Sequence, residues 1–192
     1  MCGITGYLNL DNKPASKKVI YSMTQMIKHR GPDAFGTYTD KNISIGHTRL
    51  SIVDTSEKGN QPMVSHCGNF IISYNGEIYN YLSLKKTLKK EGFKFRSDSD
   101  TEVVLNGFIR WKDKLLNKLN GMFAFAIWDK RNKSLFIARD RYGIKPVYFA
   151  KINNTFLFSS EVKSFFRHPE FNIRIEKQSV LEYFTFQNFF SN

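Results

Sequence analysis

The chain has 192 residues, and 29 lysines and arginines against 17 aspartates and glutamates give it a formal net charge of +12 at pH 7. With 41% apolar residues, 15% aromatic residues and 5 prolines, the composition is that of a packed globular domain and excludes a disordered or collagen-like chain. The length predicts a single domain. Because the sequence has no apolar run of about 18 residues and no secretory leader, we expect a soluble protein without a membrane partner. Its only cysteines, Cys2 and Cys67, indicate the reducing cytoplasm.

In the first part of the chain, apolar periodicity and turn residues predict alternating strands and helices. Residues 3–10 mix apolar side chains with glycines, which is typical of a strand whose backbone another segment approaches closely. The elements that follow are a helix from Ser16 to Gly31-Pro32, a strand over 43–53, a buried strand over 70–74 that ends in an Asn75-Gly76 turn, and a helix from Tyr81 to Gly92.

The second part begins with a helix and continues with a series of strands. Ser99-Asp100-Thr101-Glu102 has the S-x-x-E form of a capping box, which predicts a helix start. The later elements are a short helix after a break near Asp113, strands over 122–128, 134–138, 147–150 and 156–158, and terminal helices over 161–168 and 179–186. Strands combined with two groups of helices predict an α+β fold with two sheets covered by helices.

Cys2 is the first candidate for a catalytic residue. Removal of Met1 would leave a thiol and a free α-amine on the same residue. An α-amine has a pKa of about 7.7 to 8.0, so it could act as the local base for the thiol. None of the histidines stands in a protease-like cysteine signature. The alternative is a small buried apolar residue in the first strand.

Three further sites could complete a pocket for a zwitterionic amide. Asn75-Gly76-Glu77 follows a predicted strand, where an amide side chain and a main-chain N–H could stabilise an oxyanion, although an ordinary turn is the alternative. Arg49 lies in an apolar strand, where it either binds a carboxylate bidentately or points to a wet face. Asp100 could bind an ammonium group or only cap its helix.

The positive net charge raises nucleic-acid binding as another function. The basic residues are spread from Lys13 to Lys177, and the densest group, Lys85, Lys86, Lys89 and Lys90, is predicted to form the exposed face of a helix. The sequence contains no zinc-ligand spacing and no helix-turn-helix pattern. We therefore expect no nucleic-acid partner.

Seven segments carry a family resemblance that is more specific than any single motif. They are residues 1–6 (MCGITG), 29–33 (HRGPD), 47–54 (HTRLSIVD), 74–80 (YNGEIYN), 99–102 (SDTE), 121–126 (GMFAFA) and 139–146 (RDRYGIKP). In this order and spacing they resemble the glutaminase domain of the glutamine-hydrolysing asparagine synthetases, which are class II, N-terminal-nucleophile amidotransferases. The resemblance covers essentially the whole chain.

The resemblance implies a four-layer αββα sandwich of two antiparallel sheets, the N-terminal-nucleophile hydrolase fold. It implies that Cys2 attacks the side-chain amide of glutamine, that ammonia leaves, and that water releases glutamate from a thioester. The other implied roles are Asn75 and Gly76 in the oxyanion hole, Arg49 on the α-carboxylate, Glu77 and Asp100 on the α-ammonium group, and backbone atoms of Leu50, Ser51, Ile52 and Val53 lining the glutamine pocket.

The synthetases of this family continue into a second domain with an SGGxDS loop that activates aspartate with ATP. These 192 residues contain no such loop, so we expect an excised or truncated glutaminase domain whose partner is the synthetase domain. The resemblance implies no metal or cofactor in this chain, with ATP and magnesium only in the second domain. The sequence allows a homodimer without determining the oligomeric state.

Two alternatives stay open beside asparagine synthesis. One is an amidotransferase for a sugar-phosphate or purine-pathway acceptor, but those relatives usually have tryptophan after the arginine, where this chain has Leu50 after Arg49. The other is a non-catalytic binding domain, which would have no need for all of Cys2, Arg49, Asn75, Glu77 and Asp100.

Overall fold

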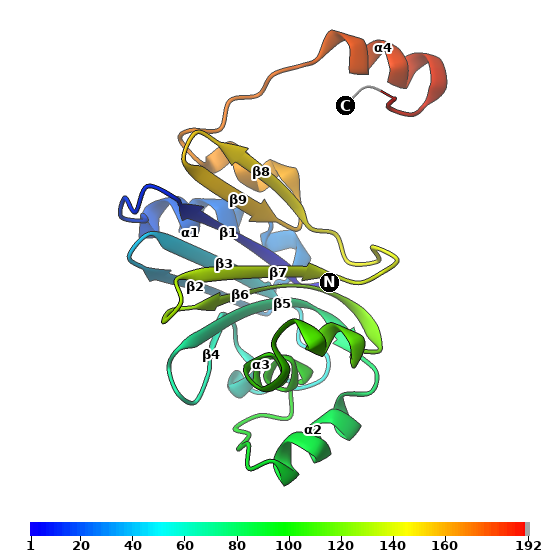
Figure 1. The fold of residues 1–192 in the computed structure, drawn as a ribbon. Helices are drawn as coiled ribbons and strands as arrows, with labels where there is room; N and C mark the ends of the chain where they lie inside the picture. Colours follow the sequence, from blue (N-terminus) through cyan, green and yellow to red (C-terminus); the bar gives the residue numbers. More distant parts are fainter. Residues whose placement is uncertain (191–192) are drawn as a thin grey trace.

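The computed structural model describes residues 1–190 and contains two antiparallel sheets packed face to face between helices (Figure 1). The strands are β1 (Gly3–Asn9), β2 (Ala34–Asp40), β3 (Ile43–Arg49), β4 (Met63–Val64), β5 (Phe70–Ile78), β6 (Gly121–Asp129), β7 (Ser134–Arg139), β8 (Tyr148–Ile152) and β9 (Thr155–Ser159). The first sheet has the order β2-β3-β1-β9-β8, and the second sheet has the order β4-β5-β6-β7.

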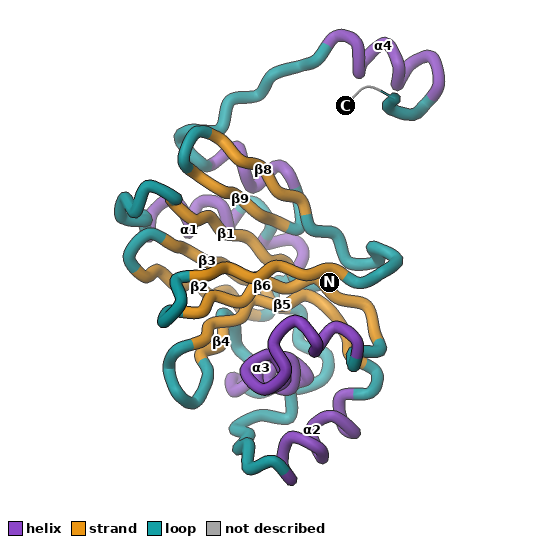
Figure 2. Tube along the Cα trace, viewed as in Figure 1, coloured by secondary structure: helices purple, strands orange, loops and turns teal. Residues whose placement is uncertain are grey.

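The α-helices are α1 (Lys17–Gln25), α2 (Tyr81–Lys90), α3 (Asp100–Trp111) and α4 (Lys177–Phe186). Helix α1 lies on the outer face of the first sheet and helices α2 and α3 lie on the outer face of the second sheet, whereas α4 lies apart from both (Figure 2). The 3-10 helices are η1 (Lys28–Arg30), η2 (Glu57–Gly59), η3 (Lys112–Asn117) and η4 (Val162–Arg167). No helix within residues 1–190 combines the length and the apolar character that a bilayer crossing requires.

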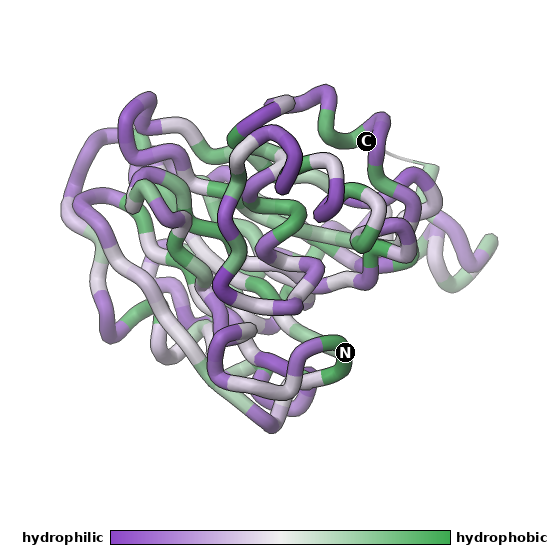
Figure 3. The backbone as a smooth tube through the Cα atoms, turned by 90° about the horizontal axis from the view of Figure 1, so that it is seen from below, coloured by the Kyte–Doolittle hydropathy of each residue, from purple (hydrophilic) through white to green (hydrophobic). Residues whose placement is uncertain are grey.

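Three apolar clusters separate the four layers. The cluster around Met23 and Phe165 fills the space between the first sheet and the helices α1 and η4. The cluster around Ile45 and Trp128 lies between the two sheets, and the largest cluster, around Phe125, lies between the second sheet and α2 and α3. The central strands are accordingly hydrophobic and the outer loops hydrophilic (Figure 3). The predicted α+β class and αββα layering are confirmed.

The first strand takes the position that its composition predicts. β1 pairs with β3 on one side and with β9 on the other, so it is the middle strand of the first sheet. A Cβ atom on Gly6 would lie 2.4 Å from the ring of Phe158, which explains why this position needs glycine. β1 therefore delivers Cys2 to the end of the sheet.

Two strand ends differ from the prediction. Asn75-Gly76 is not a turn, because β5 continues to Ile78 and pairs along its whole length with β6. Conversely, β3 ends at Arg49 and not at Val53. The main-chain N–H of Leu50 faces the Cys2 thiol and that of Ser51 faces the Asp33 carboxylate, so these groups are not available to a sheet ladder.

Several helical segments are shorter or tighter than predicted. The first helix ends at Gln25, where the hydroxyl of Thr24 already occupies the carbonyl of Ile20 at 2.6 Å, and the chain continues through η1. The predicted helices near 113–120 and 161–168 are the 3-10 helices η3 and η4, whereas α4 is longer than predicted and begins at Lys177. The strands β2 and β4 were not predicted, because β2 is an edge strand with little apolar alternation and β4 has only two residues.

The predicted helix start at Ser99 is confirmed, whereas the prediction that Lys85 is exposed is wrong. Ser99 caps α3 by accepting from the N–H of Thr101, but Glu102 does not complete a capping box, since its carboxylate accepts from Arg96 and Ser97. Lys85 does not belong to the exposed face of α2. Its ammonium group donates to the carbonyl of Ser97 at 2.9 Å, and the residue is 8% exposed.

The last helix stands apart from the sandwich. An extended segment leads from η4 to α4, which projects beyond the edge of the first sheet (Figure 1). Its aromatic residues are correspondingly accessible to solvent, and Phe184 is 80% exposed.

Candidate active site

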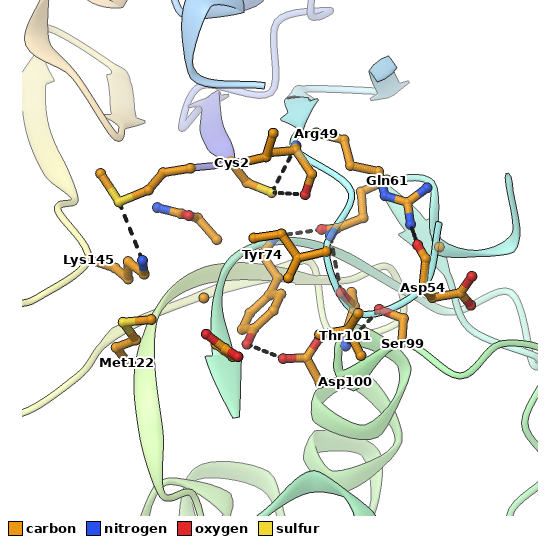
Figure 4. A pocket seen from close by; sticks show the side chains of 18 residues that line it. Cys2, Arg49, Asp54, Gln61, Tyr74, Ser99, Asp100, Thr101, Met122 and Lys145 are labelled. Carbon is orange, nitrogen blue, oxygen red and sulfur yellow. Dashed lines mark hydrogen bonds between the residues drawn. The ribbon is translucent and has the colours of Figure 1, made fainter. Parts of the chain in front are cut away.

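One cavity of about 100 Å³ opens where the start of β1, the end of β3 and the end of β5 meet the N-terminus of α3 (Figure 4). This volume suits a ligand smaller than the molecules that fill typical pockets of about 300 to 1,000 Å³. Every predicted site residue except Ser51 lines it: Cys2, Arg49, Leu50, Ile52, Val53, Asn75, Gly76, Glu77 and Asp100. Ser51 is turned toward the neighbouring loop, where its N–H donates to Asp33 Oδ2 at 2.8 Å.

The thiol of Cys2 lies against the main chain of Leu50. The N–H of Leu50 donates to Cys2 Sγ at 3.4 Å, and the thiol is 3.5 Å from the carbonyl oxygen of Leu50. Burial raises the pKa of the Cys2 thiol, and the hydrogen bond with Leu50 offsets this only in part. The thiol is therefore mostly protonated at neutral pH and needs a base to act as a nucleophile.

No histidine within residues 1–190 lines the cavity. His47 lies between the two sheets, where complete burial lowers its pKa to about 3. Its Nε2 is 3.0 Å from the carbonyl oxygen of Tyr74, which can only accept, so Nε2 carries the proton and the ring is neutral at pH 7. His47 thus joins β3 to β5 rather than serving the thiol as a base.

Asn75 and Gly76 reach the cavity from within β5. The side-chain Nδ2 of Asn75 is buried and has no hydrogen-bond partner among the described residues. Leaving such a donor unpaired costs about 1 to 3 kcal/mol, so it calls for an explanation. Gly76 is required by packing, because a Cβ atom there would lie 2.5 Å from the carbonyl oxygen of Met122 on β6. The strand therefore holds both groups rigidly, as a turn would not.

The guanidinium group of Arg49 is buried at the end of β3 and held by a loop. Its Nη1 donates to the carbonyl of Ser56 at 2.7 Å and to Asn60 Oδ1 at 2.9 Å, and its Nη2 donates to the carbonyl of Asp54. These contacts occupy three of the five N–H groups of a guanidinium, which leaves donors for a carboxylate in the cavity.

Two carboxylates line the opposite part of the cavity. Asp100 Oδ2 accepts from the hydroxyl of Tyr74 at 2.7 Å and from the N–H of Ile78 at 3.0 Å. Burial raises the pKa of Asp100, and these hydrogen bonds counteract that rise. Glu77 lines the same cavity from β5. Together with Arg49, these two carboxylates offer groups for both charges of a zwitterion, and Lys145 and Asp54 add one basic and one acidic residue to the cavity lining.

Sequence reasoning missed several residues that line or shape the cavity. Gln61 accepts from the N–H of Tyr74 at 2.7 Å and donates to Thr101 at 3.1 Å, so it ties β5 to α3. Lys145 is only 7% exposed, and its ammonium group is 3.4 Å from the sulfur of Met1. Lys145 lies within a segment that resembles the family and Gln61 lies between two such segments, but no local pattern distinguishes either residue. Residues 1–190 hold no group of three or more histidine, cysteine or acidic side chains able to bind a metal ion.

The sequence comparisons point to one family. Residues 1–192 match a family described as the glutamine amidotransferase domain. The chain is 40% identical over 187 residues to glutamine-hydrolyzing asparagine synthetase 3 of Bacillus subtilis (strain 168), which covers 96% of this chain and 30% of the relative. It is 42% identical over 190 residues to asparagine synthetase 1 of that bacterium, covering 97% of this chain and 30% of the relative. The chain therefore spans less than a third of the length of these relatives.

The structural comparison supports the fold. Glutamine phosphoribosylpyrophosphate amidotransferase from B. subtilis, in complex with ADP and GMP, matches with a TM-score of 0.72 and 22% sequence identity. The match covers 85% of this chain and 43% of that chain. This likeness confirms the predicted N-terminal-nucleophile hydrolase fold, and the relatives confirm the resemblance to asparagine synthetases.

Proposed function

The chain belongs to the glutamine amidotransferase domain family, and on that premise we propose that it hydrolyses glutamine to glutamate and ammonia with Cys2 as the nucleophile. The observation that carries the proposal is the buried, unpartnered Nδ2 of Asn75 in the cavity that also contains the Cys2 thiol. A preorganised donor without a partner gains one when an oxyanion forms beside it.

Acylation requires that Met1 is removed, because the α-amine of Cys2 then becomes the base. The amine takes the thiol proton while Sγ attacks the side-chain carbonyl carbon of glutamine. The oxyanion that forms accepts hydrogen bonds from Nδ2 of Asn75 and the N–H of Gly76. The protonated amine then gives its proton to the leaving nitrogen, so the C–N bond breaks, ammonia departs and a glutamyl thioester remains.

Hydrolysis of the thioester uses the same groups. The amine takes a proton from water while the water oxygen attacks the thioester carbon, and the oxyanion again rests on Asn75 and Gly76. The C–S bond breaks, glutamate leaves, and the amine returns its proton to the thiolate of Cys2. The sum is one glutamine and one water converted to one glutamate and one ammonia.

Substrate orientation rests on the charges around the cavity. Arg49 pairs with the α-carboxylate of glutamine through the N–H groups that the loop contacts leave over. Asp100, fixed by Tyr74 and Ile78, and Glu77 receive the α-ammonium group. Leu50, Ile52 and Val53 cover the substrate from the loop that follows β3. Both ends of the amino acid are thereby held while its amide reaches Cys2.

In the whole protein, we propose that the ammonia serves asparagine synthesis from aspartate. This rests on the two Bacillus subtilis relatives, whose names describe glutamine-hydrolyzing asparagine synthetases and of which this chain spans 30%. ATP and magnesium belong to the synthetase domain in this proposal, and that domain is the partner of the chain in the cytoplasm.

The test measures glutamate release from glutamine by the purified chain, after intact mass has shown that Met1 is gone. Cys2→Ala should abolish release without lowering the melting temperature. Cys67→Ala is the matched control, because Cys67 is an exposed free cysteine away from the cavity and its replacement should leave release unchanged. Turnover retained in Cys2→Ala would refute the mechanism.

A further inference from the structure

The nucleophile has few contacts that hold its backbone. The pairing of β1 with β3 begins at Gly3 opposite Thr48, so Cys2 lies one residue before the first sheet. After removal of Met1 it would also be a chain end, and chain ends fray unless other groups hold them. The thiol itself has only the weak contacts with Leu50. Something else must therefore fix the main chain of Cys2.

Arg30 provides that contact from η1. Its Nε donates to the carbonyl oxygen of Cys2 at 2.9 Å, and its side chain is 9% exposed. Arg30 does not line the cavity, so it contacts the nucleophile from behind and not the ligand space. The Nη2 group of Arg30 is buried and has no hydrogen-bond partner among the described residues. Because one donor is left unpaired, the hydrogen bonding of Arg30 alone does not explain why its side chain lies here.

Glu161, which is far away in the sequence, fixes Arg30. Nη1 of Arg30 donates to Glu161 Oε1 at 2.9 Å. The residue before Glu161 is tied to β1, because the N–H of Ser160 donates to the carbonyl of Ile4 at 2.8 Å and the N–H of Ile4 donates to Ser160 Oγ at 3.0 Å. Glu161 thus connects the end of β9 with the start of β1.

The carboxylate of Glu161 is ionised and lies beside three basic side chains. Burial opposes its ionisation, but hydrogen bonds from Arg30, Lys163 and His29 outweigh burial and lower the pKa of Glu161 to about 2. Lys163 Nζ lies 3.0 Å from Oε2, and His29 Nε2 lies 2.9 Å from Oε1. Lys163 and His29 are half exposed, whereas Arg30 is buried, so only the Arg30 contact leads inward to Cys2.

We infer that Glu161 is a positioning residue for the nucleophile: it orients Arg30, which holds the carbonyl of Cys2 and thereby keeps the thiol in place against Leu50. The effect that we expect on kcat rests on the proposed function. Glu161 does not line the cavity, so its loss should affect the rate of the chemical step and not the binding of glutamine.

The experiment compares three single variants and one double variant of the chain by kinetics and by thiol alkylation. Glu161→Ala should lower kcat about 10- to 100-fold, as expected for a misplaced reacting group, with KM changed by less than about twofold. Glu161→Gln keeps an acceptor for Arg30 and should recover part of the rate. Lys163→Ala is the matched control, because it removes another cation from the same carboxylate without touching the link from Arg30 to Cys2.

Alkylation by iodoacetamide reports on the thiol without glutamine, with Cys67 as the internal reference. In Glu161→Ala, Cys2 should react several-fold faster relative to Cys67, since a released thiol leaves Leu50 and reaches solvent. Arg30→Ala combined with Glu161→Ala should add no further change, because both act on one contact. If Glu161→Ala does not fold, Glu161→Gln carries the same comparison.

Three results would overturn the inference. They are unchanged kcat and unchanged Cys2 alkylation in the Glu161 variants, equal losses in Lys163→Ala, or a rise in KM as the main effect. A chain that hydrolyses no glutamine at all would refute the proposed function, and the alkylation rates would still decide the role of Glu161.

Discussion

Replacing Asn75 by leucine should lower the activity of the chain and raise its stability. Leucine has a similar size but no donor, so Asn75→Leu removes both the oxyanion contact and the unpaired Nδ2. The loss of one oxyanion donor should lower kcat about 10²- to 10³-fold, or about 2.7 to 4 kcal/mol of transition-state stabilisation. Removing an unsatisfied buried donor should raise the free energy of unfolding by about 1 kcal/mol.

The assays are glutamate release and thermal unfolding. For a chain of this size, about 1 kcal/mol corresponds to a rise in Tm of about 2 to 4 °C. Asn106→Leu is the matched control, because Asn106 is also buried but its Nδ2 donates to the carbonyl of Lys94 at 3.3 Å. That variant should lose stability and keep activity. Turnover of Asn75→Leu within tenfold of the wild type would refute the reasoning, as would a fall in Tm as large as that of the control.

Three other predictions follow from the geometry of the site. Arg49→Lys replaces the planar guanidinium group, which the loop holds in place, by an ammonium group that cannot bind a carboxylate bidentately. Steady-state kinetics should show KM for glutamine raised about tenfold or more. Tyr74→Phe removes a hydrogen bond that lowers the pKa of Asp100, so the acid limb of the kcat/KM profile should move to higher pH. The pKa of His47 is about 3 in the folded chain and 6.5 in the unfolded chain, so the contribution of neutral His47 to stability is complete above pH 6.5 and is lost toward pH 3. In urea unfolding, His47→Gln should therefore lose less stability than the wild type when the pH falls from 7 to 4.5.

The sequence was enough to predict the layers and nine of the 18 residues that line the cavity. Cys2, Arg49, Asn75 and Asp100 are far apart in the sequence, yet all four line one space. Composition could not have shown this, because only the family resemblance carries the information about which segments meet.

The failures have a common physical cause, which is pairing between distant segments. Asn75-Gly76 has the composition of a turn, but the ladder with β6 keeps it extended. Lys85 has the spacing of an exposed residue, but it is buried, and its ammonium group donates to the carbonyl of the buried residue Ser97. Glu161 acts on Arg30 across 131 positions, which no local pattern can reveal.

The central position of β1 makes the placement of Cys2 depend on residues that are far away in the sequence. One neighbour of β1 is β9, formed by Thr155–Ser159, and the carboxylate behind Arg30 belongs to Glu161, so both follow Cys2 by more than 150 positions. A nascent chain that ends before Glu161 lacks these contacts and therefore cannot position Cys2. The thiol is thus made early and becomes competent late, so an interrupted translation product should release no ammonia.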